Sequence, residues 1–282
     1  MTVVNTPLSA EDADRLRAYE RQQHDQLAPT YHDFFTPVTS LAIKPLLIAV
    51  QVRPGACLLD VATGPGSLAV EAARSGVKCT GVDLSPVMTQ LAKNSSSGID
   101  FRVADAENLP FADGSFDAVV CNFGLGHFPY PEASVAECVR VLKPDARIAL
   151  SWCDDPSKQR IQGLFREAVA EIGATPSPDV PKGHAVYRFA DTKEFRNLLE
   201  GADLIDVRVE DHQTTYLIPD VETLWRGGLG GCALTASAIA DQDAATKAAI
   251  RAALERRAEH YKTAEGIKLP IAFKIGAGRK SN

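Results

Sequence analysis

A glycine turn is the first place where the residue types and their spacing could do chemistry. Gly64, Gly66 and Ala69 follow an apolar segment at G-x-G-x-x-A spacing and begin a helical segment. Glycines allow a ligand to come close to the backbone, because they carry no side chain. A helix that begins at such a turn directs free N–H groups and the positive end of its dipole toward the ligand. The pattern therefore predicts a nucleotide site.

Three aspartates help to choose the nucleotide. Asp60 stands inside the apolar segment before the turn, where its charge would repel the pyrophosphate of a dinucleotide but would suit the ammonium group of S-adenosylmethionine. Asp83 ends the next apolar segment and could hold the ribose hydroxyls of either cofactor. Asp105 ends the third apolar segment and could accept a hydrogen bond from the adenine amine. Asp60 and Asp105 could instead cap their own turns.

The elements that must position these residues alternate along the middle of the chain. Short apolar segments typical of strands follow one another with helical segments between them, which predicts parallel pairing and right-handed crossovers. Near-continuous apolar strands are typical of a sheet covered on both faces. The carboxyl ends of such strands meet at one edge of the sheet, so the three aspartates are expected there. The expected strands are "CLLDV", "KCTGVDL", "IDFRVAD", "FDAVVCNFG" and "ARIALSW".

The flanking regions are expected to complete the sheet and to cover its edge. Helical stretches are predicted over Ser9–Gln26, with Ser9 as its cap, and over Val38–Val50. The stretch 219–261 reads as mostly helical, with a flexible break at "RGGLGG", and "IKLPIAFKIGAGRK" reads as the last strand. The predicted organisation is a helical lid over 1–52, a nucleotide-binding core over 53–152, and sheet completion with helical cap insertions over 153–282.

Four motifs carry a resemblance to a known family. "LLDVATGPG", "GVDLS", "ADAENLPFADGSFDAVVCNFGLGHFPYPE" and "ECVRVLKPDARIALSW" resemble the successive motifs of class I S-adenosylmethionine-dependent methyltransferases, over Leu58–Trp152. The nearest resemblance is to small-molecule enzymes of the ubiquinone/menaquinone and natural-product sugar O-methyltransferase type. It implies an α/β fold with a Rossmann-like sheet of seven strands, the last antiparallel. Ala62 departs from the family pattern at the first glycine, and "LKPDA" departs with Asp145 and Ala146.

The resemblance also implies roles for individual residues. The site is expected to hold the methionine part, the ribose, the adenine and the sulfonium in turn along the sheet edge. The residues implied are Asp60, Ala62, Gly64 and Gly66 for methionine, Asp83 and Leu84 for ribose and adenine, Asp105 and Ala106 for adenine, and Asn122 and Phe123 near the sulfonium.

His127 is the predicted general base. It follows the fourth expected strand, beside the place of the transferred methyl group, and a histidine titrates near neutral pH. It could instead pack or cap its loop. His24, His32 and His184 are lesser candidates. Tyr31 belongs to an aromatic cluster that could close over the cofactor, with its hydroxyl near the sulfonium, or that could simply pin the helices.

Composition and charge narrow the partners. The net charge of −6 and the lack of prolines after Asn122 argue against a nucleic-acid substrate, so a small molecule is expected. Six scattered cysteines with no C-x-x-C pair indicate free thiols in a reducing cytoplasm and no metal site. No secretory signal and no apolar run long enough for a membrane span are expected. Five aromatic residues could line a substrate pocket or could pack in the core: Trp152, Phe165, Tyr187, Tyr216 and Trp225.

The predicted function is methyl transfer from S-adenosylmethionine to a small acceptor. Oxygen is the preferred acceptor atom, because a base such as His127 would be useful there, and nitrogen or carbon stay open. Two alternatives are an NAD-linked oxidoreductase, against which Asp60 argues, and a protein of the same fold that binds S-adenosylmethionine without transferring its methyl group.

Overall fold

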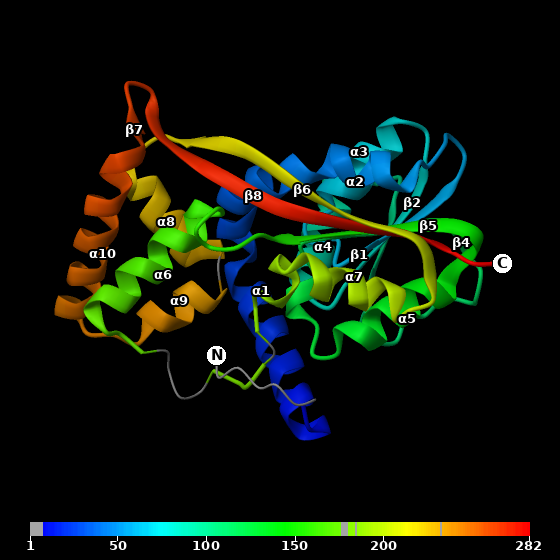
Figure 1. The fold of residues 1–282 in the computed structure, drawn as a ribbon, viewed down its shortest axis with the longest axis horizontal. Helices are drawn as coiled ribbons and strands as arrows, with labels where there is room; N and C mark the ends of the chain where they lie inside the picture. The colour runs from blue at the N-terminus through cyan, green and yellow to red at the C-terminus, as the bar shows by residue number, and fades with distance from the viewer. Residues whose placement is uncertain (1–7, 176–179, 184, 232) are drawn as a thin grey trace.

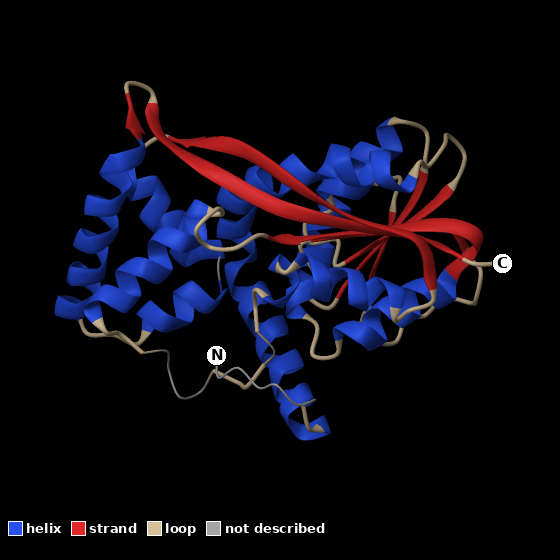
Figure 2. Cartoon of the chain, in the orientation of Figure 1, coloured by secondary structure: helices blue, strands red, loops and turns tan. Residues whose placement is uncertain are grey.

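A mixed sheet forms the centre of the computed structural model, which describes residues 8–175, 180–183, 185–231 and 233–282. Its strands follow the order β3-β2-β1-β4-β5-β8-β6, and β7 pairs with β8 (Figures 1 and 2). β5 and β8 pair antiparallel, as do β8 and β6, so the expected Rossmann-like sheet with an antiparallel last strand is confirmed. The strands are β1 (Cys57–Val61), β2 (Lys78–Asp83), β3 (Asp100–Val103), β4 (Phe116–Asn122), β5 (Leu142–Cys153), β6 (Leu204–Ile218), β7 (Lys262–Thr263) and β8 (Gly266–Lys280).

The parallel half of the sheet follows the predicted alternation. β1 pairs in parallel with β2 on one side and with β4 on the other. Residues alternate between two buried layers, so that Leu58 packs in one hydrophobic core and Leu59 in the other. The connecting helices are α3 (Ser67–Arg74), α4 (Pro86–Ser95) and α5 (Pro131–Val141), with a short 3₁₀ turn, η2 (Leu125–His127), after β4.

The later part of the chain completes the sheet and adds a helical cap. β6 and β8 are long strands that cross the molecule and end beside a group of helices away from the parallel strands (Figure 1). α7 packs against β6 and β8 at the other end. The remaining elements are α6 (Arg160–Ile172), η3 (Arg188–Ala190), α7 (Thr192–Glu200), α8 (Val221–Gly231), α9 (Ala233–Ala240), α10 (Ala244–Ala258) and η4 (Glu259–Tyr261).

The N-terminal region differs from the two separate helices expected. α1 runs without a break over Ala10–Thr39, and η1 (Ser40–Ala42) leads from it into α2 (Ile43–Val50). Ser9 caps α1 as predicted, because its hydroxyl accepts from the Asp12 N–H at 3.1 Å. "APTYHDFF" is therefore part of a long helix, which crosses the sheet edge and packs against α8 and α4.

The expectation that no apolar run reaches membrane-spanning length needs correction. Thr30–Val50 is long and apolar enough by length and composition, and 39% of that stretch is buried inside the structure. Phe34, Phe35 and Leu46 from this stretch pack in the hydrophobic core. A buried core helix and a membrane-spanning helix have a similar apolar composition, so this stretch is weak evidence for a membrane span.

"RGGLGG" is helical, where the sequence suggested a flexible break. These glycines lie in α8, where they face large side chains of other helices. A Cβ on Gly227 would come within 2.2 Å of the Phe34 ring, and one on Gly228 within 2.2 Å of the Phe165 ring. The glycines therefore permit close packing of α8 against α1 and α6, and this packing offsets their low helix propensity.

Candidate active site

The glycine turn between β1 and α3 is held by its neighbour strand. Ala62, Gly64 and Gly66 all have positive φ, at 55°, 54° and 85°. Ala62 thus occupies a left-handed conformation that favours glycine, the residue that the related motif has there. The Gly64 N–H donates to Asp83 Oδ2 at 2.8 Å, which fixes the turn against the end of β2.

Asp60 is buried beneath this turn, with 1% of its surface exposed. Its Oδ2 accepts from the Thr63 hydroxyl at 2.7 Å, whereas its buried Oδ1 has no partner of hydrogen-bond geometry in the described part of the chain. Burial raises the pKa of Asp60 to about 7, although the Thr63 hydroxyl and the Ala69 N–H act in the opposite direction. Asp60 thus holds the Thr63 side chain in the turn, and its role toward a cofactor stays a prediction.

Asp83 ends β2 at the sheet edge and organises two loops at once. Besides the Gly64 N–H, it accepts the Ser85 N–H at 2.9 Å on its other oxygen. Burial raises the pKa of Asp83, and these two backbone donors together with the nearby His24 and His127 counteract part of that rise. A carboxylate in this position keeps lone pairs for further donors, such as ribose hydroxyls.

Asp105 is engaged from two sides. Its Oδ1 accepts the Glu107 N–H at 2.9 Å, and its Oδ2 lies 2.8 Å from Nε of Arg17 in α1. Arg17 also reaches Glu107 at 2.6 Å, and Asp25 of α1 accepts the Ser85 hydroxyl. These contacts tie α1 across the carboxyl edge of the sheet.

Two cavities meet under α1. The one at the glycine turn measures about 90 Å³, and a larger one of about 530 Å³ lies toward α6 and β8. Drug-sized ligands usually occupy roughly 300–1,000 Å³, so of these two cavities the larger has that size in this structure. The residues that line both cavities are Glu20, His24, Tyr31, Phe123 and His127. They form the partition between the cavities.

Most of the predicted cofactor residues line the smaller cavity. The structure brings together there Tyr31, Ala62, Gly64, Asp83, Leu84, Asp105, Ala106, Asn122 and Phe123, together with His127. Asp60 and Gly66 lie behind this wall: Asp60 is buried, and a Cβ on Gly66 would come within 2.9 Å of Phe101. The role of each residue toward a cofactor stays a prediction.

Asn122 is held by side chains and backbone around it. Its Nδ2 donates to the Thr39 carbonyl oxygen at 3.1 Å, and its Oδ1 accepts from the Ser151 hydroxyl at 2.8 Å. The same hydroxyl accepts the Phe123 N–H at 3.0 Å. Asn122 therefore connects the end of α1 to β4 and β5 beside the partition.

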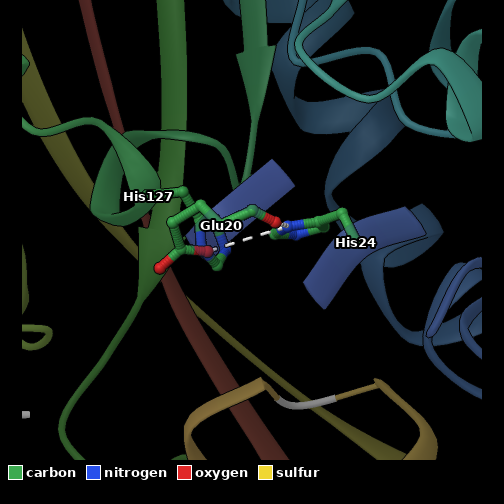
Figure 3. A group of neighbouring side chains, drawn as sticks. All are labelled: Glu20, His24 and His127. Carbon is green, nitrogen blue, oxygen red and sulfur yellow. Dashed lines mark hydrogen bonds and ion pairs between the residues drawn. The ribbon is translucent and has the colours of Figure 1, made fainter. Parts of the chain in front are cut away.

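Glu20, His24 and His127 form a compact group in the partition (Figure 3). His127 Nδ1–H donates to Glu20 Oε2 at 3.0 Å, and His24 Nδ1 lies 2.8 Å from the backbone carbonyl oxygen of Glu20. The two imidazole rings meet edge to face with centroids 4.9 Å apart. Burial would lower the pKa of His127, but the Glu20 carboxylate, with a smaller contribution from Asp83, raises it above its usual value.

The other predicted histidines are placed differently. His32 is solvent-exposed on α1, and His184 falls outside the described residues. His212, which the sequence did not single out, stacks on Phe273 with ring centroids 5.2 Å apart. Among the predicted aromatic residues, Trp152, Phe165 and Tyr187 line the larger cavity, whereas Tyr216 and Trp225 belong to the core around it.

Comparison with known proteins explains this architecture. A methyltransferase domain family matches residues 59–150. The demethylmenaquinone methyltransferase of Paenarthrobacter aurescens is 30% identical over 196 residues, which cover 65% of this chain and 77% of that protein. The chain belongs to the class I S-adenosylmethionine-dependent methyltransferases.

Other methyltransferases match over shorter stretches. The ubiquinone biosynthesis O-methyltransferase of Xanthomonas oryzae is 41% identical over 157 residues, which cover 53% of this chain and 63% of that enzyme. The ubiquinone/menaquinone biosynthesis C-methyltransferase of Geotalea daltonii is 37% identical over 144 residues, 46% of this chain and 61% of that enzyme. The chain thus spans less than two thirds of the length of these two relatives.

A solved structure shares the fold of this methyltransferase. The YcgJ protein of Bacillus subtilis superposes with a TM-score of 0.56 at 20% identity, over 86% of this chain and 98% of that protein. The likeness confirms the sheet and its helical layers. Because the chain is a methyltransferase, the NAD-linked alternative is set aside.

The residues in the wall of the smaller cavity and directly beneath it fit S-adenosylmethionine, the cofactor of this family. Asp60 offers a buried carboxylate oxygen without a partner beneath the turn, and a Cβ on Gly64 would meet no atom within 4 Å, so the backbone there is open to a ligand. Asp83 presents a carboxylate at the neighbouring strand end. These features suit a cationic nucleoside better than a pyrophosphate.

Sequence reasoning missed two residues that α1 contributes to this site, Arg17 and Glu20. Arg17 and Glu20 pair with residues about a hundred positions later, and no local motif marks them. The available signal was their spacing, because Arg17, Glu20, His24 and Tyr31 recur at intervals that place them on one face of a helix.

Proposed function

We propose that this methyltransferase methylates a hydroxyl oxygen of a small, largely apolar acceptor, with His127 as the general base. The observation that carries the proposal is the place of the Glu20–His127 pair in the partition between the two cavities. A group at that position reaches a cofactor on one side and an acceptor on the other.

S-adenosylmethionine would supply an electrophilic methyl group on its sulfonium. Asp83 and Leu84 would hold the ribose and adenine, Gly64 and Ala62 would give backbone contacts, and Asp60 would add negative charge beneath the methionine part. Tyr31 and Phe123, in the partition, present aromatic surface that a cation favours. The predicted roles of Asp105, Ala106 and Asn122 belong to the same proposal.

His127 would take the proton of the acceptor hydroxyl on Nε2. Its Nδ1–H is fixed on Glu20, which leaves Nε2 as the basic nitrogen. The Glu20 carboxylate would stabilise the imidazolium that forms, and it is 5% exposed, so its charge is little screened by water. Glu20 is thus a positioning residue for the base.

The larger cavity would receive the acceptor. Its walls are mainly apolar and include aromatic side chains such as Phe35, Trp152 and Phe165, and its volume of about 530 Å³ suits one small molecule. The relatives named above are quinone-pathway methyltransferases, and an aromatic acceptor of that size is consistent with these walls. The same proposal has three further parts: the acceptor is a small molecule and not a nucleic acid, the enzyme works in the cytoplasm, and the reaction needs no metal. The buried free thiols of Cys79, Cys121 and Cys138 suit a reducing compartment.

Product analysis tests the proposal. The protein, S-adenosylmethionine and a set of catechols and hydroquinones are incubated, and products are examined by mass spectrometry. A gain of one methyl group on oxygen is expected, and analogues whose hydroxyls are already methylated should be inert. Continued methylation of the blocked analogues would reveal a carbon acceptor. Cofactor binding without any methylated product would instead favour the non-methylating alternative.

A further inference from the structure

One face of α6 brings polar groups to the acceptor cavity, whose other walls are mainly apolar. Gln159 caps this helix, and Gln162 and Arg166 follow at spacings that place all three on one side. All three line the cavity. Polar groups in an otherwise apolar cavity usually fix the orientation of a ligand.

Arg166 is supported at the rim of the cavity by Tyr187. The guanidinium carbon of Arg166 lies 5.1 Å from the centre of the Tyr187 ring, and the Tyr187 hydroxyl donates to Gln162 Oε1 at 2.8 Å. Stacking on an aromatic ring orients an arginine and leaves the N–H groups at its edge available for hydrogen bonds. The three side chains thus form one connected polar group.

Arg166 makes no ion pair with another described residue, in contrast to the charges beside it. Glu167, next in sequence, pairs with Arg160 at 2.7 Å and with Arg257 at 3.5 Å. Asp155 interacts electrostatically with Arg166 but forms no ion pair with it. The Asp155 carboxylate accepts the Ser157 N–H at 2.8 Å. Arg166 therefore lines the cavity as an exposed cation without an ion-pair partner among the described residues.

The charges of the cavity are separated. Among the described residues that line it, Glu20 is the only acid, and it lies in the partition, beside His127. An anionic group on the acceptor would be attracted to Arg166 on α6 and not to the Glu20 carboxylate in the partition. That arrangement would turn the opposite end of the acceptor toward His127.

We infer that the acceptor is an acid: an apolar or aromatic hydroxy compound whose carboxylate binds Arg166 while its hydroxyl faces His127. The inference rests on the proposed function, since it assigns the acceptor to this cavity. A single arginine backed by neutral Gln162 and Tyr187 matches one negative charge, so a carboxylate suits it better than a doubly charged phosphate.

Matched pairs of acid and ester test this inference. Binding of 3-(3,4-dihydroxyphenyl)propanoate, 4-hydroxyphenylacetate and the methyl ester of each is measured by calorimetry on protein saturated with S-adenosylhomocysteine. The acids should bind at least about tenfold more tightly than their esters, because a charge-assisted hydrogen bond is lost in the ester. Arg166→Gln should remove that preference. Arg208→Gln should keep it, because Arg208 is an exposed arginine on β6 without an ion pair among the described residues.

The outcomes separate the inference from the proposed function. Equal binding of acid and ester, an unchanged preference in Arg166→Gln, or no binding of either acid while S-adenosylhomocysteine still binds would each overturn the inference. Methyl transfer to neutral phenols would be unaffected by those results. Tight binding of the acids together with methylation of carbon instead of oxygen would support the role of Arg166 in binding the carboxylate. The same result would contradict oxygen as the acceptor atom.

Discussion

Glu20 Oε2 lies 3.0 Å from His127 Nδ1, and the two residues are 107 positions apart in the chain. The contact joins α1 to η2, the turn that follows β4, so the proposed base is completed only when the first helix lies across the sheet edge. The proposed base and the wall of the smaller cavity thereby depend on the same helix.

His127→Gln should reduce kcat/KM by about 100-fold or more, since general-base catalysis contributes roughly 10²–10⁴-fold. Glu20→Gln should reduce it less and should move the rising limb of the pH profile to lower pH. The sign follows because the Glu20 carboxylate raises the pKa of His127, so its loss makes the imidazole neutral at a lower pH. Initial rates across pH 5.5–9 give both effects.

His32→Gln is the matched control for that series, because His32 is exposed on the same helix. It should leave the profile unchanged. A Glu20→Gln profile that coincides with the wild-type profile would show that Glu20 does not set the pKa of the base.

Asp83→Asn should weaken binding of S-adenosylhomocysteine by about 10–100-fold, as expected for the loss of a hydrogen bond to a charged group. The amide keeps the shape of the side chain, and the effect is measured by calorimetry. Asp100→Asn is the control, because it makes the same change at the exposed start of β3, away from the site. This variant should bind S-adenosylhomocysteine normally. Equal affinities of both variants would remove Asp83 from the cofactor site.

The sequence could predict the parallel half of the fold because its signals are local. Each strand is an apolar run, and each crossover helix has apolar residues at helical spacing. Asp83 and Asp105 follow at strand ends, which lie at one edge of a parallel sheet. The antiparallel last strand and the cofactor came from the family resemblance, and both are confirmed.

The remainder depends on contacts between distant segments. Nothing around Arg17 or Glu20 in the sequence indicates that α1 crosses the sheet edge. "RGGLGG" was interpreted by its helix propensity, yet Phe34 and Phe165 decide its structure by requiring small partners. Asp60 was expected to contact the cofactor, yet its side chain is buried against Thr63 and does not line the smaller cavity. The sequence does not show this packing.

The free protein should lose stability as the pH rises from about 4 to about 7. Burial raises the pKa of Asp60 from its ordinary value of 3.8 to about 7 in the folded protein, so the folded state binds an extra proton between these pH values and loses this advantage above them. The full effect is on the order of 4 kcal/mol for about three pKa units. The raised pKa of Asp83 acts in the same direction.

Denaturant unfolding at several pH values measures that slope. Asp60→Asn removes the titrating group and should flatten the decline, and Asp100→Asn should not. An identical slope in wild type and Asp60→Asn would show that Asp60 is not protonated in the folded protein.

Gly228→Ala should destabilise the protein by about 1–3 kcal/mol, the usual cost of overpacking a filled site. The added Cβ would lie 2.2 Å from the Phe165 ring, and Phe165 is fully buried between α6 and α8, so the helices must separate. Gly98→Ala is the control, because a Cβ there meets no atom within 4 Å and its φ is not positive. Thermal unfolding should show a lower Tm for Gly228→Ala and little change for Gly98→Ala. Because Phe165 also lines the acceptor cavity, Gly228→Ala should weaken acceptor binding more than binding of S-adenosylhomocysteine; the reverse order would place the acceptor elsewhere.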